Sequence, residues 1–180
     1  MSLIPALSRL ALRPLARPTA RAASRALCAD GYDEVPIKGT KTHENLKSAF
    51  SAKSMAVLRF EYYAQKADVE GYTNASAAFR AAAESAKQQA FGHFEFLEEV
   101  GDPATDAEVG SVTTNLQGAV ASEMDESERM YPSWANMAQS EQIDDVSEWF
   151  TNLSNTSMRN ANALQAVLDD INKEYGFDKE

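Results

Sequence analysis

Residues 38–64 read KGTKTHENLKSAFSAKSMAVLRFEYYA, and this stretch decides the fold because its apolar side chains recur at helical spacing. The stripe consists of Leu46, Phe50, Val57, Phe60 and Ala64. Its spacing predicts one long helix over residues 42–69 that buries one face and ends before Gly71.

Three further helices are expected, over residues 75–99, 105–139 and 141–174. The third contains a second informative stretch, NLQGAVASEMDESERMYP at residues 115–132. No alternating β-branched run interrupts this pattern. The sequence therefore predicts an all-α chain whose four helices form an antiparallel bundle with short connections.

Local signals refine the ends of these helices. Asn74 is a candidate N-cap for the second helix. Thr105 and Glu108 fit a capping box, which would begin the third helix near Thr105. Pro132 lies inside the third helix and should kink it, because proline removes a backbone donor.

Composition limits the class of protein. The chain has 180 residues, 44% hydrophobic and 24% charged, which suits one domain with a packed core. No run approaches the roughly 18 consecutive apolar residues of a membrane span. Cys28 is the single cysteine, so an internal disulfide and a CxxC metal motif are excluded.

Charge is distributed unevenly. Residues 1–29 hold no acidic residue and five arginines, namely Arg9, Arg13, Arg17, Arg21 and Arg25. Such a segment, rich in arginine and free of acids, is typical of a mitochondrial transit peptide. A basic extension that docks on an acidic partner is the alternative.

The remainder of the chain holds the other 12 basic residues and all 27 acidic residues, a net charge of −15. This charge argues against nucleic acid as a partner, because phosphate backbones bind clusters of Lys and Arg. We divide the chain into a targeting leader or basic extension (1–29), a linker (30–41), a four-helix domain (42–174) and a C-terminal tail (175–180).

The two quoted stretches resemble rubrerythrin, a ferritin-like four-helix bundle that holds two irons and reduces peroxide. The resemblance implies a rubrerythrin-type fold over the helical domain, without the rubredoxin-like module that requires cysteine pairs. It also implies which residues of this chain occupy the seven metal-ligand positions of the family.

Two of these seven positions keep a carboxylate, at Glu123 and Glu126. The other five carry residues that are not the family's ligands: Lys53, Ala86, Gln89, Ser157 and Asn160. Two carboxylates on one helix cannot hold two irons, because each hard divalent ion needs several oxygen or nitrogen ligands. We therefore expect no metal, no other cofactor and no catalytic residue.

Three fates are open for the former metal site. Lys53 could pair with Glu123 or Glu126 while Gln89 and Asn160 donate hydrogen bonds, since buried carboxylates need compensation. Alternatively, the smaller Ala86 and Ser157 could leave a cavity, or a pocket for a small molecule or lipid.

These observations predict a non-catalytic, metal-free accessory subunit of a mitochondrial assembly, such as a respiratory-chain or ATP-synthase complex, on the matrix side of the inner membrane. Its partners would be other subunits of that complex, and a homodimer is left open. The alternative is a divergent di-iron enzyme that reduces peroxide or oxidises iron, with a remodelled site. That site would need the following side chains to converge: Glu61, His93, Glu95, Glu123 and Glu126.

Overall fold

The computed structural model describes residues 36–176, and the predicted leader at 1–29 lies outside them. The described residues form α-helices α2 (Lys41–Val69), α3 (Thr73–Leu97), α4 (Val112–Asp125), α5 (Tyr131–Ser140) and α6 (Asp144–Tyr175). A π-helical turn, η1 (Glu126–Met130), joins α4 to α5. Residues 36–176 contain no strand, so the all-α prediction is confirmed, and the helices are those expected from the resemblance to a ferritin-like, rubrerythrin-type bundle.

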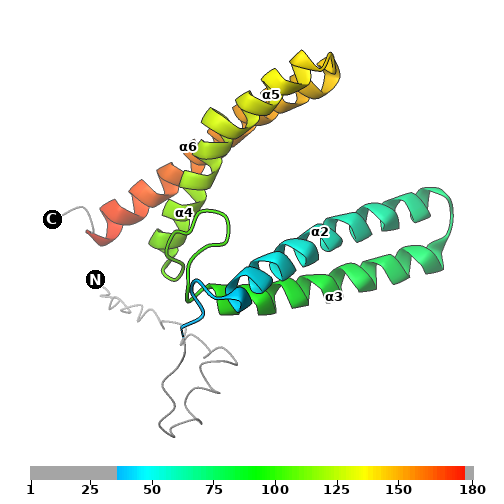
Figure 1. The fold of residues 1–180 in the computed structure, drawn as a ribbon, viewed down its shortest axis with the longest axis horizontal. Helices are drawn as coiled ribbons and strands as arrows, with labels where there is room; N and C mark the ends of the chain where they lie inside the picture. Colours follow the sequence, from blue (N-terminus) through cyan, green and yellow to red (C-terminus); the bar gives the residue numbers. More distant parts are fainter. Residues whose placement is uncertain (1–35, 177–180) are drawn as a thin grey trace, which may run out of the picture. The chain divides into compact units, whose positions relative to one another are not determined.

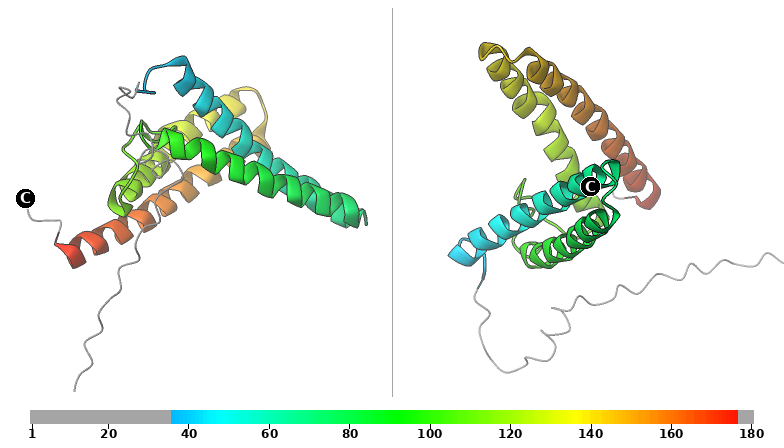
Figure 2. Two further views of the ribbon diagram at one scale, coloured as in Figure 1. Left: turned by 90° about the horizontal axis from the view of Figure 1, so that it is seen from below. Right: turned by 90° about the vertical axis from the view of Figure 1, so that its right-hand side faces the viewer.

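The helices pair as two antiparallel hairpins. The first hairpin is α2 packed on α3, and the second is α6 packed on α4, η1 and α5 (Figure 1). The further views show the same pairing within each hairpin (Figure 2). None of the described helices is both long and apolar enough to cross a membrane.

Small side chains let α2 and α3 approach closely. The buried residues of this hairpin are Ala64, Ala67, Ser76, Ala83, Ala86, Ala90 and Leu97. Toward the turn, Phe60 and Tyr63 contact Phe79, with ring centroids 6.5 and 5.6 Å away. The predicted stripe of α2 therefore faces α3, as its periodicity required.

Of the two helices in the first hairpin, only α2 has a side-chain cap at its N-terminus. Thr40 caps α2, because its hydroxyl accepts the amide of His43 at 3.2 Å. Gly71 provides the turn after α2 with φ +81°. The predicted cap at Asn74 is wrong: α3 begins at Thr73, and its N-cap residue Tyr72 makes no side-chain capping bond.

The third helix begins later than predicted. No helix begins at Thr105, because Asp102 Oδ1 accepts hydrogen bonds from its amide at 2.9 Å and from its hydroxyl at 3.1 Å. These bonds stabilise a loop over residues 98–111. Ser111 then caps α4 by accepting the amide of Thr114 at 3.1 Å.

Pro132, where a kink was predicted, is the second residue after the π-helical turn and lies in the first turn of α5. A π turn widens the backbone hydrogen bond from i−4 to i−5. Proline has no N–H, so it leaves a carbonyl of this turn without its backbone donor. The carbonyl of Ser127 instead accepts the hydroxyl of Ser154 on α6 at 2.8 Å.

Candidate functional site

The second hairpin holds a polar cluster that we call the carboxylate cluster: Glu123, Glu126, Tyr131, Ser157 and Asn160. Glu123 and Glu126 lie one turn apart, at the end of α4 and the start of η1. Ser157 and Asn160 lie one turn apart on α6. Residues at i and i+3 share a helix face, so the two pairs meet across the hairpin.

Each glutamate has a neutral partner on α6. The hydroxyl of Ser157 donates to Glu126 Oε2 at 3.0 Å, and Ser157 itself is 5% exposed. The amide nitrogen of Asn160 lies 3.4 and 3.3 Å from the two carboxylate oxygens of Glu123. The expected hydrogen bonds from Asn160 are therefore present, and Ser157 contributes one that was not expected.

Tyr131 is the member of the cluster that the sequence did not single out. Burial raises the pKa of its phenol above the ordinary 10.0, and the charges of Glu126 and Glu123 and a hydrogen bond to Glu126 act in the same direction. The signal was its position one residue before Pro132, where η1 ends and its amide bonds to the carbonyl of Glu126.

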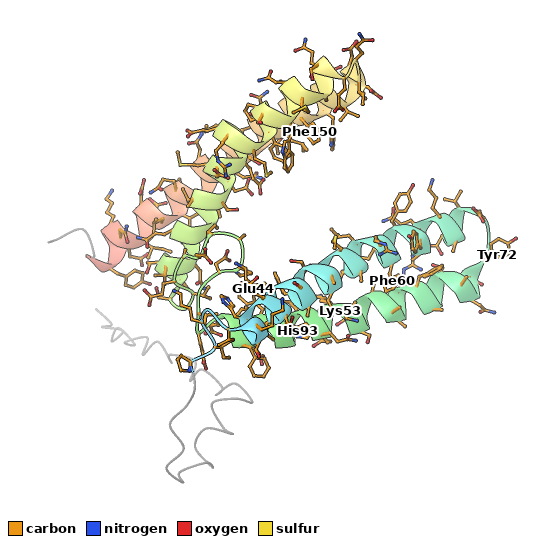
Figure 3. The ribbon with its side chains drawn as sticks, in the orientation of Figure 1. Glu44, Lys53, Phe60, Tyr72, His93 and Phe150 are labelled. Carbon is orange, nitrogen blue, oxygen red and sulfur yellow. The ribbon has the colours of Figure 1, made fainter. Side chains whose placement is uncertain are left out.

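The other three positions that the resemblance assigns to metal ligands lie on the first hairpin. Lys53 is half-buried on α2 (Figure 3), and no ion pair among residues 36–176 joins it to Glu123 or Glu126. Gln89 is exposed and donates to Ser85 at 3.2 Å within α3. The proposed Lys53 ion pair is therefore absent from the described residues.

Ala86 is buried at 3% exposure, so its small side chain serves the close packing of α3 on α2. A cavity of about 440 Å³ does border Glu123, but the loop at residues 98–111, α4 and Phe94 of α3 line it. Neither Ala86 nor Ser157 lines this cavity. Loss of bulk at those two positions therefore does not account for it.

The residues present do not fit a resident two-metal centre. Within residues 36–176, no group of three or more His, Cys, Asp and Glu side chains could hold a metal ion. His93 (Figure 3) and Glu95 lie on α3, in the first hairpin. They do not form such a group with Glu61 or the two cluster glutamates. Among the seven positions that the resemblance assigns to metal ligands, the two carboxylates are thus bonded to neutral side chains.

Comparison with known proteins identifies the family. Residues 44–167 match the Rubrerythrin family model. The chain is 32% identical over 152 residues to Rubrerythrin-1 of Clostridium acetobutylicum, covering 80% of this chain and 78% of that protein. It is 29% identical over 147 residues to Rubrerythrin of Porphyromonas gingivalis, covering 79% of this chain and 74% of the relative.

These relatives correct the functional expectations. The prediction of a non-catalytic accessory subunit is wrong, because the matching proteins are named rubrerythrins and point to an oxidoreductase family. The predicted mitochondrial location and respiratory-chain association are contradicted as well, because these relatives are bacterial proteins. Self-association stays a prediction.

The family model covers most of the helical domain, including both hairpins. Two relatives exceed 30% identity over more than two thirds of the chain. The helices, the retained glutamates and these matches agree with one another, and the chain belongs to the rubrerythrin family.

Proposed function

We propose that this chain is an oxidoreductase that couples the oxidation of ferrous ions to the reduction of hydrogen peroxide, with Glu123 and Glu126 binding the ferrous substrate. Family membership supports an oxidoreductase, and the alternative stated from the sequence was a peroxide-reducing or iron-oxidising enzyme with a remodelled site. Iron enters here as a substrate that binds and leaves. A site with only two carboxylate ligands is compatible with that role, because it would bind the ion weakly.

The single observation that carries the proposal is the state of the two carboxylates. Glu123 and Glu126 are half-buried, one turn apart, and their hydrogen-bond partners Asn160, Ser157 and Tyr131 are neutral. No ion pair of residues 36–176 neutralises either glutamate. Two adjacent uncompensated carboxylates favour a divalent cation, for which oxygen ligands are the usual choice.

The reaction balances without a further reductant. Two ferrous ions each lose one electron, the O–O bond of peroxide breaks, two protons are taken up, and two water molecules form. The acidic surroundings favour delivery of the cation, because the chain after residue 29 carries a net charge of −15. The carboxylates stabilise the higher charge of the ferric product more than that of the ferrous substrate.

The test follows ferrous oxidation after peroxide is added under anaerobic conditions. Glu123→Gln with Glu126→Gln keeps the shape of both side chains and removes both charges. We expect about tenfold or greater loss of the protein-dependent rate, because affinity for hard cations follows the number of charged ligands. Glu141→Gln with Glu148→Gln is the matched control, since both residues are exposed on the same hairpin and the charge change is equal.

Equal rates in the wild-type chain, the double variant and protein-free solution would contradict the proposal. Peroxide consumption that requires an organic electron donor and no added iron would also contradict it, because the proposed reaction draws its electrons from ferrous ions.

A further inference from the structure

We infer that Ser157 and Asn160 replace a resident metal as the positioning residues of Glu126 and Glu123, so that the second hairpin folds and keeps its carboxylate pair in place without metal. The disagreement between the family's ligand set and the residues of this chain is the starting point. The inference deepens the proposed function and rests on it only for the kinetic readout described below.

The geometry pairs each replaced position with a retained one. Ser157 stands where the resemblance implies a glutamate ligand, and its hydroxyl reaches Glu126 at 3.0 Å. Asn160 stands where the resemblance implies a histidine ligand, and its amide spans both oxygens of Glu123 at 3.4 and 3.3 Å. The two residues that would have shared a metal with the glutamates therefore contact them directly.

These two bonds belong to a longer series along α6. Ser154 donates to the carbonyl of Ser127 at 2.8 Å, and Ser147 donates to the carbonyl of Ala135 at 2.9 Å. The donors of α6 recur at spacings of three and seven residues, which keep one side of a helix toward the opposing chain. Four polar contacts thus fix the register of α6 against α4, η1 and α5.

The donors are neutral, and this distinguishes them from a metal or a lysine. A cation would cancel the charge of Glu123 and Glu126, as the absent Lys53 pair would have done. Hydroxyl and amide donors satisfy lone pairs and leave the negative charge in place. The hairpin therefore holds both carboxylates in place and leaves their negative charge uncompensated, as reversible binding of a ferrous ion requires.

The first experiment measures denaturant unfolding of the full chain as purified, with and without a chelator. We expect coincident curves, since no resident metal contributes to stability. A double-mutant cycle then combines Ser157→Ala with Glu126→Met, which removes the acceptor. Ser157→Ala should raise the unfolding equilibrium constant about tenfold beside Glu126. In the Glu126→Met background it should change that constant far less.

Additive effects in the cycle would overturn the inference, as would a loss of stability on adding the chelator to the wild-type chain. The control is Ser133→Ala, an exposed serine on α5 that should show no coupling with Glu126→Met. This unfolding assay uses no added iron and no peroxide, so its failure is distinguishable from failure of the proposed reaction.

A kinetic readout separates positioning from general stability. Ser157→Ala and Asn160→Ala should each raise the KM for ferrous ions several-fold at temperatures where the variants stay folded, with kcat nearly unchanged. Ser133→Ala should leave both parameters as they are. Unchanged KM values in folded Ser157→Ala and Asn160→Ala would overturn the positioning role.

Discussion

Several influences act on one hydroxyl group at Tyr131. Burial, the negative charges of Glu126 and Glu123, and a hydrogen bond to Glu126 all favour the neutral phenol. Ionisation would place a third negative charge beside the carboxylate pair. Tyr131 therefore stays a hydrogen-bond donor to Glu126 throughout the neutral range.

The pH dependence follows from the direction of this shift. The pKa of Tyr131 in the folded chain lies above 10.0, its value without these neighbours. Its contribution to stability is fully present below about pH 10 and is lost as the pH rises through the folded-state pKa. Ultraviolet titration should show that Tyr131→Phe removes ionisation from the alkaline end of the curve and that Glu126→Gln lowers the midpoint of Tyr131.

A titration of Tyr131→Phe that loses signal only near the ordinary tyrosine midpoint would contradict this environment.

The partner of a single residue could be predicted from the sequence where both residues lie in the same hairpin. Asn160 was expected to donate to a cluster glutamate, and it does so. The helices that carry the two residues, α6 and α4, are paired both in the predicted bundle and in the structure. Lys53 was expected to reach the same glutamates from the other hairpin, and the described residues contain no such pair. A charge-compensation argument names partners by chemistry and cannot supply the distance between two hairpins.

At the scale of the element, periodicity predicted four long helical segments well, and local signals misplaced their ends. The capping box at Thr105 failed because Asp102 competes for the same amide and hydroxyl. The π turn before Pro132 was not foreseen. Its stability depends on a serine 27 residues away in sequence, and no local pattern reports that contact.

Gly101 holds the loop after α3 in shape. Its φ is +120°, and a Cβ there would lie 3.0 Å from the carbonyl oxygen of Asp106. Gly101→Ala should therefore lower the free energy of unfolding by about 2 kcal/mol. Thermal unfolding checks this against Gly92→Ala, a helical position with nothing within 4 Å, which should gain about 0.5–1 kcal/mol.

Equal effects of the two alanines would show that the loop does not need the left-handed backbone.

Ser154 completes the backbone bonding of η1. Ser154→Ala should leave the carbonyl of Ser127, a buried residue, without a donor and cost about 1 kcal/mol in the free energy of unfolding. Ser85→Ala on the exposed side of α3 is the matched substitution and should stay within about 0.5 kcal/mol of wild type. Calorimetry of both variants compares the two losses, and similar values would contradict the role of Ser154.

At the scale of the whole molecule, the family and its all-α architecture were predictable because they rest on patterns spread over both hairpins. The function was predicted wrongly from absent ligands, since a missing ligand excludes one metal centre and leaves other uses of the scaffold open. The comparisons with rubrerythrins indicate an oxidoreductase family instead.

Restoring the family's ligand set should restore a resident metal centre. The variant carries five substitutions: Lys53→Glu, Ala86→Glu, Gln89→His, Ser157→Glu and Asn160→His. Without metal it should be less stable than wild type, because it buries carboxylates and crowds the position of Ala86. Added ferrous iron should raise its Tm, whereas the Tm of the wild-type chain should change little.

An iron-independent Tm for the five-residue variant would contradict the assignment of these ligand positions.

The measurement that tests the central claim most directly is anaerobic binding of ferrous ions to the purified chain, by equilibrium dialysis. We expect weak, reversible binding that a chelator removes and that Glu123→Gln with Glu126→Gln abolishes. Iron that remains bound after dialysis against the chelator would reveal a resident centre and contradict the account. Binding that is equal in the wild-type chain and the double variant would also contradict it.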